Sequence, residues 1–196
     1  MYCGEVPRLW SETIAGHRAT VRGAILDAAW RLVSERGLAS VTMSQIAEQA
    51  GIGRATLYKY FPDTEAILLA WHEEQVGRHL ELLAATRAAN PDPVEGLKAV
   101  LTAYARIARH RGRHPDDLAG FLHRGSALEP AQLRLMTLVT DLIADAAAVG
   151  AVRGDTDPTR LASYVLHALA AASDTPDEEA MRQLVDVVLT GLRPAG

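Results

Sequence analysis

The sequence has little of what marks disulfide-rich, secreted or membrane-spanning proteins. Cys3 is the only cysteine among 196 residues, which excludes an intrachain disulfide framework and a multi-cysteine metal site. No apolar run approaches the roughly 18 residues that a membrane-spanning helix needs. The N-terminal segment also lacks the basic start and apolar centre of a signal peptide. We therefore expect a soluble, cytoplasmic protein that does not associate with a membrane.

Aromatic residues are scarce too, at 5% of the chain, although 48% of the residues are hydrophobic. Much of that hydrophobic content is Ala and Leu, which favour helices, and no segment alternates as a strand does. The predicted fold class is all-α, with about nine helices of unequal length.

The net charge of −4 argues against a surface that is basic all over. The balance differs along the chain, because seven Lys/Arg face six Asp/Glu up to Asp63, while thirteen face eighteen in the remainder. Between Glu48 and Asp63 there is no acidic residue at all. A local basic surface in the N-terminal third is therefore compatible with the acidic total.

Helix signals organise the first third of the chain. Residues 1–17 show no sustained period and are predicted to form an arm, and a first amphipathic helix is predicted from about Arg18 to Gly37. Thr42 and Gln45 fit a capping box at the start of a second helix. Gly51 suits a left-handed cap, and a third, short helix is predicted over 54–60, with Leu57 and Phe61 facing the core.

Prolines and aspartates mark the expected helix boundaries in the rest of the chain. Asp63, Asp92 and Asp157 each stand where a helix N-cap is expected. After the third helix, the pattern predicts one long helix over about 64–89 and further helices at about 93–110, 116–124, 130–149, 158–173 and 177–192.

The second and third predicted helices, joined by a glycine-containing turn, form a helix-turn-helix pattern. With Leu57 and Phe61 buried, the third helix directs Arg54, Tyr58 and Lys59 outward, where such side chains can contact phosphate and base edges. The alternative is that Arg54 and Lys59 only solvate an exposed face.

The stretch "VTMSQIAEQAGIGRATLYKYFPDTEAIL" resembles the DNA-binding signature of the tetracycline-repressor-like (TetR) transcriptional regulators. The motif similarity covers about Arg18 to Leu69, and the remainder resembles the family in length, helix count and the segment "GAVRGDTDPTRLASYVLHAL". The resemblance implies a helix-turn-helix DNA-binding domain over 18–63, and a helical-bundle domain for ligand binding and dimerisation over 64–196.

Site residues follow from the resemblance. Thr42, Thr56, Tyr58 and Tyr60 would contact phosphate, while Arg54, Ala55 and Lys59 stand where the family reads bases. Two positions depart from the family pattern: Gly53 offers no side-chain cap, and Thr64 replaces a usual phosphate-binding lysine, which predicts a smaller salt dependence of DNA binding.

In the family, the larger domain encloses a small-molecule pocket. The resemblance implies ligand-lining candidates on the middle helices, although ordinary core packing is the more frequent role for any single one of them: Trp71, Tyr104, Phe121, His123 and Met136.

The last two predicted helices carry apolar stripes. In the family the corresponding helices pair with those of a second subunit in a four-helix bundle, and packing within one chain is the alternative. The dimer-interface candidates are Leu161, Tyr164, Val165, Ala168, Leu184, Val185, Val188 and Leu192.

Catalytic and metal chemistry find little support in the sequence. There is no glycine-rich phosphate loop after a strand and no HExxH motif, and neither the pair His72 and His79 nor the pair His110 and His114 has a persuasive third ligand. We predict no cofactor and no metal.

The predicted function is a homodimeric, ligand-responsive repressor that binds a pseudo-palindromic operator in double-stranded DNA. The alternative is an all-α enzyme or ligand carrier that uses the helical hairpin only for packing.

Overall fold

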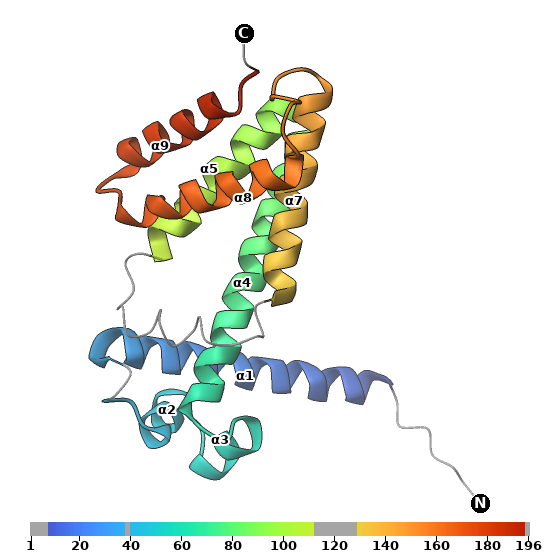
Figure 1. Ribbon diagram of the computed structural model, residues 1–196. Helices are drawn as coiled ribbons and strands as arrows, with labels where there is room; N and C mark the ends of the chain where they lie inside the picture. Colours follow the sequence, from blue (N-terminus) through green and yellow to red (C-terminus); the bar gives the residue numbers. More distant parts are fainter. Residues whose placement is uncertain (1–7, 38–39, 112–128, 195–196) are drawn as a thin grey trace, which may run out of the picture. The chain divides into compact units, whose positions relative to one another are not determined.

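The computed structural model describes residues 8–37, 40–111 and 129–194. Every regular element within these ranges is helical, which confirms the predicted all-α class (Figure 1). In chain order the elements are α1 (Arg8–Arg36), α2 (Met43–Gln49), α3 (Arg54–Tyr60), α4 (Thr64–Ala89), α5 (Pro93–Arg111), α7 (Glu129–Ala148), α8 (Pro158–Ala170), the 3₁₀ helix η3 (Ala171–Asp174) and α9 (Glu178–Gly191). None of these helices is long and apolar enough to cross a membrane. The helix predicted over 116–124 lies outside the described residues.

The helices form two compact units, one up to Glu73 and one from Glu74 onward, and α4 contributes to both. In the first unit, α1, α2, α3 and the start of α4 pack their apolar faces together. The completely buried side chains of this core include Ile25, Ile46, Leu57 and Ile67. Trp30 and Trp71 stack with their ring centroids 3.8 Å apart, which ties α1 to α4 within this unit.

The helix-turn-helix is built by local signals. Thr42 Oγ1 accepts a hydrogen bond from the Gln45 backbone N–H, and the Thr42 N–H donates to Gln45 Oε1 at 2.9 Å, so the predicted capping box is present. Gly51 has φ +67°, the predicted left-handed conformation, and α3 begins after Gly53 without a side-chain cap. These features fix the direction in which α3 leaves α2.

The predicted start of the first helix at about Arg18 is wrong, because α1 begins at Arg8. Residues 8–17 are therefore helical rather than part of an arm. Gly16 lies inside this helix, and a glycine at an interior helix position costs only about 1 kcal/mol relative to alanine. The Thr20 hydroxyl donates to the Gly16 carbonyl oxygen at 3.0 Å, one turn away along the same helix.

The second unit has its own hydrophobic core, which is formed by α5, α7, α8 and α9 together with Leu83 of α4. Asp92, Asp157 and Asp177 cap α5, α8 and α9 through side-chain oxygens that accept backbone N–H bonds of 2.8–3.2 Å. Helix α8 ends at Ala170, earlier than predicted, because the chain tightens there into η3.

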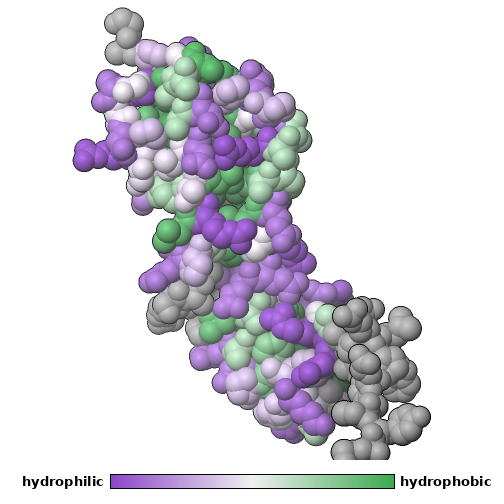
Figure 2. Space-filling model, turned by 90° about the vertical axis from the view of Figure 1, so that its right-hand side faces the viewer, coloured by the Kyte–Doolittle hydropathy of each residue, from purple (hydrophilic) through white to green (hydrophobic). Residues whose placement is uncertain are grey.

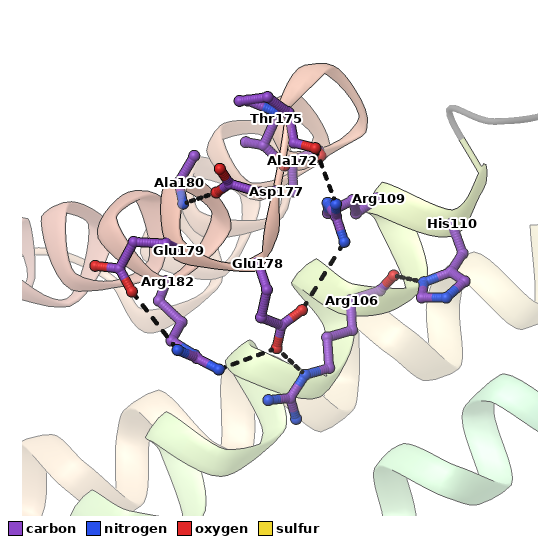
Figure 3. Close-up of polar contacts among 11 residues, drawn as sticks. Arg106, Arg109, His110, Ala172, Thr175, Asp177, Glu178, Glu179, Ala180 and Arg182 are labelled. Carbon is purple, nitrogen blue, oxygen red and sulfur yellow. Dashed lines mark hydrogen bonds and ion pairs between the residues drawn. The ribbon is translucent and has the colours of Figure 1, made fainter.

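One carboxylate joins α5 to α9 in the second unit. Glu178, at the first position of α9, lies among Arg106, Arg109 and Arg182 (Figure 3), and Arg106 Nε donates to it at 2.8 Å. The hydrogen bond from Arg106 lowers the pKa of Glu178. Arg109 Nη2 also donates to the Pro176 carbonyl oxygen at 3.1 Å. The start of α9 is therefore held against the end of α5.

Candidate nucleic-acid interface

Helix α3 presents a polar face to solvent. Leu57 is completely buried and Phe61 is 7% exposed, so these two side chains hold α3 on the core as predicted. Among the predicted DNA contacts, Tyr60 is half-buried, and the others are exposed: Thr42, Arg54, Ala55, Thr56, Tyr58 and Lys59. Five of these exposed positions follow from the period of one short helix anchored at Leu57.

The electrostatics of this face suit a polyanion. Arg54 and Lys59 make no ion pair with any described residue, and the segment from 49 to 62 contains no carboxylate. Arg22 of α1 lies over the Phe61 ring, with 5.7 Å between its guanidinium carbon and the ring centroid. The face therefore offers cations and hydroxyls without acidic side chains to repel phosphate.

Three of the five predicted ligand-lining residues lie among the described residues. Trp71 is 8% exposed and belongs to the core of the first unit, while Tyr104 and Met136 pack at the edge of the core of the second. Phe121 and His123 lie outside the described residues.

Described residues of the second unit line several hollows. One of about 320 Å³ lies among α5, α9 and the segment that follows α7, and two of about 360 and 560 Å³ lie along α4 and α7. Arg87 lines both hollows along α4 and α7, and it pairs with Asp145 at 2.8 Å and with Asp141 at 3.4 Å. None of the three is lined by Trp71, Tyr104 or Met136.

The terminal helices bury most of their apolar stripes within the chain. Leu161, Val165, Val185, Val188 and Leu192 are at most 7% exposed and belong to the core of the second unit. Among the predicted interface residues, Tyr164 is exposed, whereas Ala168 and Leu184 are half-buried. Only these three keep surface that a partner subunit could contact.

Two further surface residues were missed by the sequence reasoning. Val187 is 66% exposed on α9. The sequence could have indicated it, because Val187 is an apolar residue that lies outside the inward-facing stripe of this helix. A Cβ built on Gly191 would lie 3.2 Å from Tyr164 Oη, so the absence of a side chain lets Tyr164 lie against α9. On the face drawn in Figure 2, hydrophobic areas lie among hydrophilic side chains.

Two histidines of the described residues make local contacts within their own helices. Within the described ranges, no group of three or more His, Cys, Asp and Glu side chains is arranged to hold an ion. His110 and His167 instead each contact a backbone carbonyl one turn earlier in their own helices, at 2.8 and 2.7 Å.

Two segments of the chain match two family descriptions. Residues 25–71 match "Bacterial regulatory proteins, tetR family", and residues 92–194 match "Transcriptional regulator SbtR-like, C-terminal domain". The chain belongs to the TetR family of transcriptional regulators. The first match covers the second part of α1 from residue 25, all of α2 and α3, and the start of α4, so the family assignment and the exposed face of α3 concern the same segment.

Relatives of this TetR-family chain agree with the assignment. An uncharacterised HTH-type transcriptional regulator of Mycobacterium tuberculosis is 31% identical over 184 residues, which are 89% of this chain and 90% of that protein. The "Fatty acid metabolism regulator protein" of Bacillus subtilis is 32% identical over 96 residues, 49% of this chain and 44% of that protein. The chain thus spans about half the length, or less, of several curated relatives that it matches.

Solved structures share the fold. A TetR transcriptional regulator from Streptomyces coelicolor is 31% identical, with a TM-score of 0.61 over 89% of this chain and 99% of that one. A TetR/AcrR-family regulator from Thermobifida fusca has a TM-score of 0.76 over 88% and 98%, at 24% identity. At that identity the second likeness concerns the fold alone.

Proposed function

We propose that this protein is a homodimeric, ligand-responsive regulator that binds a pseudo-palindromic operator through α3. Residues 18–63 would carry DNA binding, and residues 64–196 would carry ligand binding and dimerisation. The observation that carries the proposal is the exposed, carboxylate-free face of α3, held on the core by Leu57. The family's usual function supports it.

The side chains of this face divide into two roles. Arg54 is the best candidate for a bidentate contact to guanine, a contact that discriminates between bases by about 1–3 kcal/mol. Ala55 and Lys59 would also face base edges, whereas the phosphate contacts would come from the hydroxyls of Thr42, Thr56, Tyr58 and Tyr60. Thr42 has a second task, because its hydroxyl already caps α2, so its substitution would change DNA affinity and helix stability together.

DNA binding is tested with fragments from the neighbourhood of the protein's own gene. In a fluorescence anisotropy titration, Arg54→Ala should weaken specific binding about tenfold or more. Lys59→Ala should lower the slope of log K against log salt by about one. Arg31→Ala is the matched control, since Arg31 is exposed on α1 outside the recognition helix. If the wild type ignores all fragments at low salt, or Arg54→Ala binds as the wild type does, the proposal of operator binding through α3 fails, and the alternative of an all-α enzyme or carrier is favoured.

Dimerisation is proposed at the outer face of α8 and α9. Tyr164, Ala168 and Leu184 keep exposed surface there, and Val187 and the Gly191 backbone add to it. Burying a carboxylate in such an interface is costly, so Val187→Asp should shift the protein from dimer to monomer in light scattering after size exclusion. Val149→Asp is the control, because Val149 is also exposed (59%) but lies beyond α7. Equal behaviour of the two variants would contradict this interface.

The effector is proposed to be a small molecule bound in the second unit. A FadR of Bacillus subtilis was solved in complex with stearoyl-CoA, with a TM-score of 0.65 to this chain at 16% identity, so acyl-CoA thioesters are a reasoned first set of probes. A true effector should raise the melting temperature and weaken operator binding, since the two equilibria are linked. A compound that stabilises the protein and leaves operator affinity unchanged is not the inducer.

Repression and activation are distinguished by a promoter reporter, whose expression is measured in cells with and without the gene for this protein.

A further inference from the structure

We propose that the hollow of about 320 Å³ among α5, α9 and the segment after α7 binds a small amphipathic zwitterion, of the class of an amino acid with an apolar side chain. This proposal does not depend on DNA binding. The hollow lies within the second unit, where the start of α5, the end of α7 and the end of α9 come together (Figure 1).

The floor of this hollow is apolar and well fixed. Leu97, Ala146, Val152 and Leu192 line it, and each is at most 5% exposed. The backbone N–H of Arg153 donates to the Leu192 carbonyl oxygen at 2.8 Å, which fastens the segment after α7 to the end of α9. An apolar group of a ligand would therefore meet a preformed surface, and the volume is at the lower end of the range for small-molecule sites.

The walls carry both signs of charge. Glu95 and Lys98 come from α5, while Asp186 and Arg193 come from α9 and its end. Within the described part of the chain, none of these four side chains makes an ion pair or a side-chain hydrogen bond. By contrast, Arg87, which lines the other two hollows, is already paired with two carboxylates. The walls therefore have two cations and two anions available to a ligand.

This combination selects a class of ligand. A ligand with a single charge would be attracted by two of these four side chains and repelled by the other two, so the charges of the walls give it little net attraction. A molecule that carries an ammonium and a carboxylate can satisfy both kinds of wall residue, while its apolar part covers the floor. The small volume restricts that part to about the size of a leucine or phenylalanine side chain.

The test uses the full chain, with L-phenylalanine and L-leucine as probes in isothermal titration calorimetry and thermal shift. Both amino acids should bind and raise the melting temperature. 3-Phenylpropionate lacks the ammonium and phenethylamine lacks the carboxylate, so each should bind about tenfold more weakly than L-phenylalanine or worse. Lys98→Gln and Asp186→Asn should each weaken L-phenylalanine binding, and Ala151→Trp, which fills the hollow, should abolish it.

The control variant is Arg134→Gln, because Arg134 lines a different hollow in the same unit. It should leave L-phenylalanine binding unchanged. The proposal is overturned if neither amino acid binds, if both one-charge analogues bind as well as L-phenylalanine, or if Lys98→Gln and Asp186→Asn bind as the wild type does. The last comparison does not depend on whether Ala151→Trp folds. All of these measurements are made without DNA, so their failure leaves the operator-binding proposal intact.

Discussion

Replacing Leu57 with alanine should unfold the first unit at a lower denaturant concentration while leaving the second unit almost unchanged. Leu57 is completely buried, and a leucine-to-alanine change at such a site costs about 2–5 kcal/mol. For a unit this small, a urea m value of about 1 kcal/mol/M is expected. The midpoint of the first unit should therefore fall by about 2 M urea or more.

The assay uses the placement of the tryptophans. All three, Trp10, Trp30 and Trp71, precede Glu74, so tryptophan fluorescence reports on the first unit, whereas circular dichroism at 222 nm reports on both. Leu57→Ala should shift the fluorescence transition. Leu169→Ala, at a completely buried position in the second unit, should shift the dichroism transition and leave the fluorescence transition in place.

Equal shifts of both signals in both variants would refute the reasoning, because they would mean that the units unfold as one. If Leu57→Ala does not fold at all, Ile46→Val provides the milder perturbation. Ile46 is also completely buried in the first unit, and the loss of one methyl group costs about 0.5–1.5 kcal/mol. Its fluorescence midpoint should fall by about 1 M urea.

Two further predictions concern single positions. Gly51→Ala should destabilise the first unit by about 1–2 kcal/mol, because a Cβ is unfavourable at φ +67°. Gly23 lies inside α1 with open space around it, so Gly23→Ala should instead stabilise the first unit by about 0.5–1 kcal/mol. Both changes are measured in the same fluorescence assay. Glu178→Gln should lower the urea midpoint of the second unit at neutral pH. The pKa of Glu178 is lowered in the folded state, chiefly by the hydrogen bond from Arg106, so its contribution is complete above the unfolded value of about 4.3 and is lost as pH falls through the lower folded value. The dichroism midpoints of wild type and variant should therefore converge in acid, and a gap that persists there would argue against the ion pair.

The sequence by itself determined the features that depend on residues a few positions apart. The capping box of Thr42 and Gln45, the left-handed Gly51 and the aspartate caps were all predictable, because a side chain meets the backbone N–H groups two or three residues ahead wherever the helix lies. The outward face of α3 followed from the same local period once Leu57 was taken as buried. The predicted function came from the motif that resembles the TetR family, because capping and helix periodicity alone do not predict a function.

Only the tertiary structure decided which partner each apolar surface meets. The stripes of α8 and α9 were predicted correctly as stripes, but a stripe shows which side of a helix avoids water and not what covers it. Leu161, Val165, Val185 and Val188 are covered by their own unit, and this leaves Tyr164, Val187 and the bare Gly191 backbone on the outside. The stack of Trp30 on Trp71 and the hollow between α5 and α9 likewise join residues at least forty positions apart. Such contacts depend on the path of the whole chain, because packing brings together side chains that the sequence separates.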